Sequence, residues 1–350
     1  MASSISSSEV AEAARAILEG LSRVIVGSGG VSEQVLASAM AGGHVLLEGV
    51  PGVAKTTLAR ALARLLGVEN ARTELDGVVH RGFRRIQFTP DLLPGDVTGS
   101  LVYDPDRREF VFKPGPVFSY LLLADEINRA VPRTQSALLE AMQERQVTVG
   151  GVSYRLEDEA AGKWFLVIAT QNPVEQEGTF PLPEAQLDRF MTRVFVSYPP
   201  GVEDEVNVLR LHLGRLREPL EELEPVVDPG WLLEARRHVA RVAVPDDILA
   251  YIARVVRATR PEEGATAGLL SLGASPRAGI MLARYSQALA LIRGRPAVSL
   301  DEVNDALFPV LNHRLLPDPD ALLEYEDKYG RAQARRRLVE DALSRAVKAG

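Results

Sequence analysis

The stretch Gly49-Val50-Pro51-Gly52-Val53-Ala54-Lys55-Thr56 decides the fold class, because it lies between an apolar run and a helical pattern. The run HVLL at 44–47 is typical of a buried strand, and residues 57–66 are typical of a helix. A glycine-rich loop in this place wraps backbone N–H groups around phosphates at the N-terminus of a helix. We therefore expect a nucleotide-binding P-loop rather than a glycine-rich turn without a ligand.

Two side chains of this loop suit a nucleotide that carries magnesium. Lys55 would reach the β- and γ-phosphates, and Thr56 would offer its hydroxyl to Mg²⁺. The residue before the lysine is usually glycine, and here it is Ala54. Alanine is small enough for that position, provided that the backbone there does not need a positive φ.

Polar residues end two further predicted strands, the apolar runs 120–123 and 165–169. The first run leads into Asp125 and Glu126, and the second into Asn172. In an α/β sheet, ligands bind at the carboxyl ends of the strands. We expect Asp125 to hold Mg²⁺, Glu126 to act as general base on the attacking water, and Asn172 to position that water or sense the γ-phosphate. On its own, an acidic pair after a strand is more often a helix N-cap, and Asn172 before proline would be a plain turn.

Two arginines stand out. Arg189 lies in the run QLDRF, and phosphoryl transfer develops charge that an arginine, often from a neighbouring subunit, can stabilise. On spacing alone, a surface ion pair of Arg189 with Asp188 or Glu184 fits the sequence about as well as this catalytic role. Arg277 follows Ser275-Pro276 in the first turn of a predicted helix, where cations are disfavoured, and this hints at an anionic partner.

The expected architecture is an α/β P-loop NTPase core, a parallel sheet with helices on both faces, followed by a smaller all-α lid domain. Residues 95–118, around Asp104-Pro105-Asp106, and residues 146–164, around Gly150-Gly151, predict two inserted β-hairpins. We predict a disordered lead at 1–8, the nucleotide-binding domain at 9–200, a linker at 201–228 and the helical domain at 229–350. Helices are predicted over 10–23, 134–145, 229–242, 245–259, 276–293, 300–311 and 321–347.

Composition narrows the function classes. The formal net charge of −7 over 350 residues, without a helix-turn-helix or a basic tract, argues against a nucleic-acid binder. The chain has no cysteine, which excludes disulfides and thiolate metal sites and fits a reducing cytosol. We find neither a signal peptide nor an apolar stretch of about 18 residues, so we expect a cytoplasmic protein without membrane insertion.

Taken together, these motifs resemble the MoxR family of AAA+ ATPases over about residues 20–315. The resemblance implies that Lys55 and Thr56 belong to Walker A, Asp125 and Glu126 to Walker B, and Asn172 to sensor 1. It also implies that Arg189 is a trans-acting arginine finger and Arg277 is sensor 2 on the lid. The segments that carry it are 49–56, 88–99 (FTPDLLPGDVTG), 113–118, 122–129 (LLADEINR), 135–144, 169–173 and 183–190.

The resemblance further implies ATP and Mg²⁺ as cofactors and a homo-oligomeric ring, commonly a hexamer. The hairpins resemble the helix-2 insert and the pre-sensor-1 insertion of that clade. Partners would be a von Willebrand factor A-domain protein and a client protein, sometimes for metal-cofactor insertion. Whether Arg129 or Arg133 also acts in trans stays open. The residues expected to contact the nucleotide are Val26 and Gly27 near adenine, with Gly49, Pro51, Gly52, Val53, Ala54, Lys55, Thr56 and Thr57.

Three other functions compete with an ATP-driven, chaperone-like remodeller. A magnesium-chelatase-type motor subunit shares the motif order, but Ala54 and the run LADEINR favour the MoxR family. A small-molecule kinase would need an acceptor pocket and an arginine-rich lid, whereas the second half reads as a helical bundle. A non-hydrolysing, nucleotide-gated scaffold has no need of Glu126 as a base beside the metal-binding acid.

Overall fold

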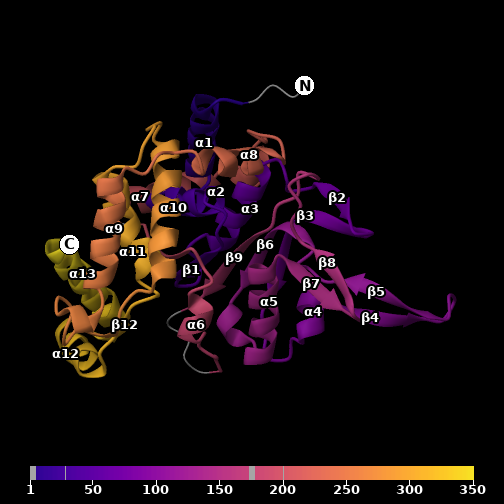
Figure 1. The fold of residues 1–350 in the computed structure, drawn as a ribbon. Helices are drawn as coiled ribbons and strands as arrows, with labels where there is room; N and C mark the ends of the chain where they lie inside the picture. Colours follow the sequence, from indigo (N-terminus) through magenta and orange to yellow (C-terminus); the bar gives the residue numbers. More distant parts are fainter. Residues whose placement is uncertain (1–4, 28, 173–177, 200) are drawn as a thin grey trace.

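A six-stranded sheet in the order β10-β1-β9-β6-β3-β2 organises the first part of the chain (Figure 1). The computed structural model describes residues 5–27, 29–172, 178–199 and 201–350. Five neighbouring strands run parallel, and β2 closes the edge in the antiparallel direction. The strands are β1 (Val45–Gly49), β2 (Arg72–Leu75), β3 (Val78–Gln87), β6 (Ser119–Asp125), β9 (Leu166–Gln171) and β10 (Thr192–Val196).

Helices cover both faces of the sheet. Successive side chains of a strand point to opposite faces, so one strand contributes to two cores. In β1, Val45 and Leu47 enter one core with the first three helices, whereas Leu46 enters a second core. The first core is covered by α1 (Ser7–Ser22), α2 (Gly29–Met40) and α3 (Lys55–Leu65), and the second by α4 (Pro94–Thr98) and α5 (Pro132–Glu144). Such two-sided burial explains why the central strands read as continuous apolar runs.

Both predicted hairpins are confirmed. The strands β4 (Gly99–Asp104) and β5 (Glu109–Pro114) form a ribbon that projects from the body (Figure 1), and β7 (Gln146–Val149) pairs with β8 (Val152–Arg155) beside it. The rings of Phe112 and Tyr154 stack at 4.4 Å between the two hairpins. The hairpins therefore support each other, and Val147 of the second hairpin also enters the core beneath the sheet.

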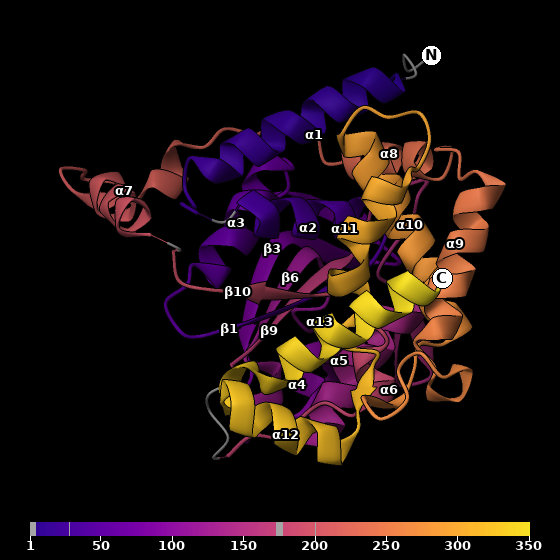
Figure 2. The same ribbon diagram turned by 90° about the vertical axis from the view of Figure 1, so that its left-hand side faces the viewer.

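The rest of the chain is mainly helical and packs against α1, α2 and β10 (Figure 2). A four-residue helix, α6 (Glu184–Leu187), precedes β10, and a small antiparallel pair, β11 (Leu270–Leu272) and β12 (Leu316–Pro317), lies among the later helices. Those helices are α7 (Val202–His212), α8 (Trp231–Val239), α9 (Asp246–Ala258), α10 (Pro276–Ile292), α11 (Leu300–Leu311), α12 (Pro319–Tyr329) and α13 (Arg331–Ala349). Within the described ranges, no helix is both long and apolar enough to cross a membrane.

Several expectations need correction. The single helix predicted at 321–347 is two helices, because Gly330 takes a positive φ of 76° and turns the chain between α12 and α13. The predicted linker contains α7, and α1 begins at Ser7 inside the predicted disordered lead. Of the elements of the sheet and its helical cover, α2, β2, β3 and β10 were not predicted, nor were the short α4, α6, β11 and β12.

The buried Lys163 fastens the second hairpin to the sheet. Its ammonium group donates to the carbonyls of Ser119 (2.9 Å), Leu156 (2.7 Å) and Trp164 (2.6 Å). Burial lowers the pKa of Lys163 to about 7, so the ammonium form depends on these three acceptors. The side chain thus joins the start of β6, the segment after β8 and the start of β9.

We expect Lys163→Met to lower the free energy of unfolding by about 2–4 kcal/mol, because three buried carbonyls lose their donor. Urea unfolding followed by circular dichroism measures this difference. Lys113→Met on the exposed hairpin strand β5 is the matched control, expected within about 0.5 kcal/mol of wild type. Equal losses for the two variants would contradict this role of Lys163.

Candidate functional site

The predicted phosphate loop connects β1, which ends at Gly49, to α3, which begins at Lys55. Gly52 and Ala54 both take left-handed backbone conformations, with φ of 82° and 56°. Turns of this kind direct successive N–H groups into a concavity that suits an anion. A Cβ on Gly52 would meet no atom within 4 Å, so the space beside the loop is open.

Ala54 does not meet the condition that the sequence placed on it, since its φ is positive. A left-handed conformation costs an alanine about 1–2 kcal/mol. Lys55 follows with its ammonium group over the start of the loop, donating to the carbonyl of Gly49 at 2.5 Å and that of Val50 at 3.3 Å. The loop therefore combines a strained residue with a cation at its start. Strained backbone of this kind is typical of functional sites.

A cavity of about 360 Å³ lies beside the phosphate loop. Val26 and Gly27, predicted to lie near adenine, line it together with residues 52–54. One wall comes from α7, through Glu205, Val208 and His212, which recur at helical spacing. No pattern in the sequence indicated that this helix, in a predicted linker, would face the loop. The other residues that line the cavity are Val24, Ile25, Val196, Ser197, Tyr198, Pro199 and Leu211.

The two predicted acids are tied together by a residue that the sequence did not single out. Thr170, at the end of β9, donates its hydroxyl to Asp125 Oδ1 at 2.6 Å and accepts the Glu126 N–H at 2.9 Å. Asp125 Oδ2 accepts from Arg85 on β3 at 2.6 Å. One hydroxyl therefore sets the positions of both acids at the carboxyl edge of the sheet, where Asn172 also lies, one residue after β9.

The Glu126 carboxylate is oriented from two sides. Gln87 Nε2 donates to its Oε2 at 2.7 Å, and Arg129 donates to the same oxygen at 3.0 Å. The backbone at Glu126 is left-handed, with φ 55°. Arg129 is thus engaged with an acid of its own chain, which bears on the open question of whether it acts in trans.

The positions of residues 173–177, including the proline of the motif 169–173, lie outside the described part of the chain.

A buried ion pair underlies the phosphate loop. Glu48, one residue before the loop, accepts from Arg193 Nε on β10 at 2.7 Å and from Gln171 Nε2 on β9 at 2.5 Å. These three side chains join the ends of β1 and β9 to the start of β10. The one available sequence signal was an acid inside an otherwise apolar strand, which is unusual unless the acid is paired.

The arginines lie at the other edge of the sheet. Thr192 pairs with Val45 at the start of β1, and Val196 pairs with Gly49 at the phosphate loop. Arg189 precedes β10, so the length of a strand, about 16 Å, separates it from its own loop. Arg277 lies in the same place, because its guanidinium is 3.7 Å from the Asp188 carboxylate. The two arginines are thus brought together, away from the P-loop and the acids.

Three consecutive residues after α11 hold the arginine segment in place. Asn312 Nδ2 donates to the carbonyl of Arg193 at 2.9 Å, and His313 Nε2 lies 3.1 Å from the carbonyl of Phe190. Arg314, almost fully buried, donates to Asp188 Oδ1 at 2.7 Å. Burial lowers the pKa of Arg314 to about 10, and its pairing with Asp188 offsets part of that cost. The helical domain therefore fixes the segment that carries Arg189.

The residues present fit magnesium only as part of a nucleotide complex. No group of three or more His, Cys, Asp or Glu side chains in the described part of the chain could hold a metal ion by itself. Thr56 and Asp125 can supply one or two oxygen ligands, and Mg²⁺ commonly takes the rest from phosphates and water. The predicted metal residues thus suit an ion that arrives with its ligand.

Thr170→Val should impair both acids while keeping the shape of the side chain. Asp125 and the Glu126 N–H would lose their shared partner, and we expect kcat for ATP hydrolysis to fall about 10- to 100-fold. Thr170→Ser keeps the hydroxyl and should retain most of the activity. Steady-state ATPase assays compare the variants, with circular dichroism as a folding check. Equal activity of the Val and Ser variants would contradict the role of the Thr170 hydroxyl.

Comparison with known proteins agrees with this geometry. Residues 44–192 match the model of the ATPase family associated with various cellular activities (AAA), and residues 262–328 match the AAA lid domain. The chain is 44% identical to the uncharacterized protein YeaC of Bacillus subtilis over 88% of either chain. It is 41% identical to Chaperone MoxR1 of Mycobacterium tuberculosis, over 90% of this chain and 78% of that protein.

Among solved structures, a candidate ATPase of Cytophaga hutchinsonii is similar, with a TM-score of 0.80 and 37% identity. The match covers 97% of this chain and 96% of that one. Similarity of this extent in both sequence and structure, together with the order of the motifs, leads to one conclusion. The chain belongs to the MoxR family of AAA+ ATPases.

Proposed function

We propose that this chain hydrolyses ATP in a ring of identical subunits and uses the cycle to remodel or mature other proteins. The observation that carries the proposal is the position of Arg189 and Arg277 at the edge of the sheet opposite the phosphate loop. An arginine there cannot reach its own nucleotide, but it can reach that of a neighbour in a head-to-tail ring. Such contacts complete the site between subunits.

Within one subunit, Lys55 binds the β- and γ-phosphates, and Thr56 and Asp125 hold Mg²⁺. The magnesium ion would neutralise phosphate charge when bound. Glu126 accepts the proton of the attacking water, with its orientation set by Gln87 and Arg129 through Oε2. Asn172, buried at the same edge, positions that water or senses the γ-phosphate.

The adenine lies in the cavity between residues 26–27 and α7, with Gly49, Pro51, Val53 and Thr57 completing the contacts around the loop. From the neighbouring subunit, Arg189 stabilises the charge that develops during transfer, and Arg277 assists it. Each catalytic site therefore combines the phosphate side of one subunit with the arginine side of the next. A hexamer is the ring size that the family resemblance favours.

The chaperone-like part of the proposal draws on the relative named Chaperone MoxR1. The projecting β4–β5 hairpin exposes Tyr103 and Phe110, which suits contact with another protein. A von Willebrand factor A-domain partner, a client protein and metal-cofactor insertion are finer parts of the proposal. A magnesium-chelatase-type motor is the second candidate, since it uses the same motifs, and a non-hydrolysing scaffold is the third.

ATPase activity measured against protein concentration tests the core of the proposal. Turnover per subunit should rise with concentration, because active sites form only on assembly. Lys55→Ala and Arg189→Ala should each lower kcat about 100-fold or more, whereas Glu126→Gln should bind ATP without hydrolysing it. Turnover that is independent of concentration would favour a monomeric enzyme instead.

Mixing inactive variants tests whether Arg189 acts in trans. In a one-to-one mixture of Lys55→Ala and Arg189→Ala, about a quarter of random interfaces join an intact loop to an intact arginine, so about a quarter of wild-type activity should return. Lys55→Ala mixed with Glu126→Gln is the control. Both of those defects lie on the phosphate side, so no intact site can form. The absence of rescue in the first mixture would contradict the shared site.

Arg277→Ala should behave like Arg189→Ala rather than like Lys55→Ala. Because Arg277 lies 3.7 Å from Asp188, we expect its loss to lower kcat tenfold or more without lowering ATP affinity in the isolated subunit. A mixture of Arg277→Ala and Lys55→Ala should regain activity. If Arg277 instead acted on the nucleotide of its own subunit, every subunit in the mixture would lack either Lys55 or Arg277, and the mixture would stay inactive.

A further inference from the structure

Helix α7 carries an apolar stripe that the described part of the chain leaves largely exposed. No residue of α7 is buried, and Val202, Leu209 and Leu213 are 82%, 58% and 71% exposed. Val202, the half-buried Val206 and Leu209 are spaced by four and three residues, which places them on one side of the helix axis, and Leu213 and Leu216 follow just beyond its last turn. The nucleotide cavity is lined by an adjacent side of α7, through Glu205, Val208 and His212. One helix thus faces the nucleotide and also presents an uncovered apolar stripe.

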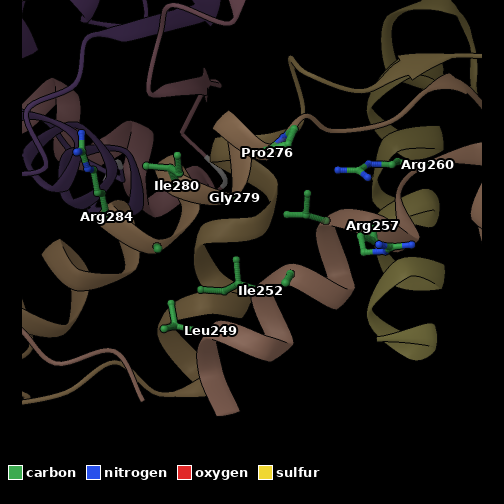
Figure 3. Close-up of a pocket in the computed structure, with 11 residues that line it drawn as sticks. Leu249, Ile252, Arg257, Arg260, Pro276, Gly279, Ile280 and Arg284 are labelled. Atoms are coloured by element: carbon green, nitrogen blue, oxygen red, sulfur yellow. The ribbon is translucent and has the colours of Figure 1, made fainter. Parts of the chain in front are cut away.

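A groove of matching character lies between α9 and α10 (Figure 3). Its cavity of about 420 Å³ is lined by Leu249, Ile252, Val256 and Ile280, with Gly279 between them. Gly279 widens the groove, since a Cβ there would lie in ordinary van der Waals contact, 3.7 Å from Val256 and 4.0 Å from Ile252. Ile280 is 57% exposed. The groove therefore has room for aliphatic side chains of another helix.

Charge at the two surfaces is complementary. Arg257, which pairs with Glu263 of its own chain, and Arg260 and Arg284 surround the groove (Figure 3), although the chain as a whole carries a formal charge of −7. Helix α7 begins with three consecutive acids, residues 203–205. Acidic side chains beside the apolar stripe would meet the arginines beside the groove, and such pairing favours one orientation of the two surfaces.

The α7 that fills this groove would be that of a second copy. Figure 2 shows α7 on one side of the molecule and α9 and α10 on the opposite side, so a chain cannot fill its own groove. The groove also begins at Pro276, beside Arg277. Under the proposed function, Arg277 approaches the nucleotide of a neighbour, and α7 forms a wall of that nucleotide's cavity. The same approach brings the groove of one subunit to the α7 of the next.

We infer that the apolar stripe of α7, centred on Leu209, docks in the α9–α10 groove of the adjacent subunit. The inference rests on the proposed ring and adds the surface that joins one subunit's nucleotide cavity to the next subunit's lid. The contact is head-to-tail, because the two surfaces differ and lie on opposite sides of the chain.

Cross-linking tests this contact directly, because the chain has no native cysteine. Leu209→Cys and Ile280→Cys proteins are mixed with ATP in a Glu126→Gln background and treated with a short bismaleimide. We expect a cross-linked dimer in the mixture and none with either variant alone. A chain carrying both cysteines should give a ladder that ends at the ring. Leu323→Cys, 61% exposed on α12, replaces Ile280→Cys as the matched control and should give no dimer with Leu209→Cys.

Assembly is followed in parallel by mass photometry, which separates this inference from the ring itself. Rings that form without the 209–280 cross-link would overturn the docking and leave the ring intact, whereas the absence of any assembly would overturn both. Leu209→Asp should raise the concentration for half-assembly about tenfold or more, with Leu323→Asp unchanged. Both side chains are exposed, so neither change should affect folding. An equal effect of the two substitutions would also overturn the docking.

Discussion

Parallel strands separate the two halves of the candidate site. Because β1, β6 and β9 run in one direction, the phosphate loop, the acids and Asn172 gather where these strands end. Arg189 comes just before β10, at the edge where the strands begin, and residues 312–314 hold that segment against the helical domain. The direction of the strands thus gives one subunit a phosphate side and an arginine side that face apart. Within this geometry, catalysis of the proposed kind depends on assembly.

Buried polar contacts link these two sides through the sheet. Glu48 pairs with Arg193 below the phosphate loop, and the carbonyl of Arg193 accepts a hydrogen bond from Asn312 of the helical domain. Buried ion pairs add little net stability, because desolvation offsets most of their attraction. Apolar side chains in place of this ion pair would hold the strands together equally well. The pair instead ties the end of β1 to the start of β10, so that the loop and the arginine segment keep a constant relation.

The sequence predicted the elements whose signals are local. Strands buried on both faces read as apolar runs, and each ended at a polar residue, so Lys55, Asp125 and Asn172 could be assigned to one edge. Strand β3 could not be predicted, because charged residues interrupt its run VVHRGFRRIQ. Helix α2 lacked a polar face, since it is buried on most sides. Arg85, Gln87 and Thr170 reach the acids only through contacts between strands, and such contacts leave no local pattern.

Helix α7 illustrates how a short element can depend on its surroundings. It has 11 residues and buries none of them, and isolated helices of that length are marginal in water. Acids in its first turn and Arg210 and His212 in its last turn suit the helix dipole, but such terms amount to about 1 kcal/mol or less each. The helix α7 would gain further stabilisation from molecules that contact its exposed sides. A nucleotide would cover the side facing the cavity, and a neighbouring subunit would cover the apolar stripe. Because one helix offers both sides, ordering by either partner lowers the entropic cost of binding the other.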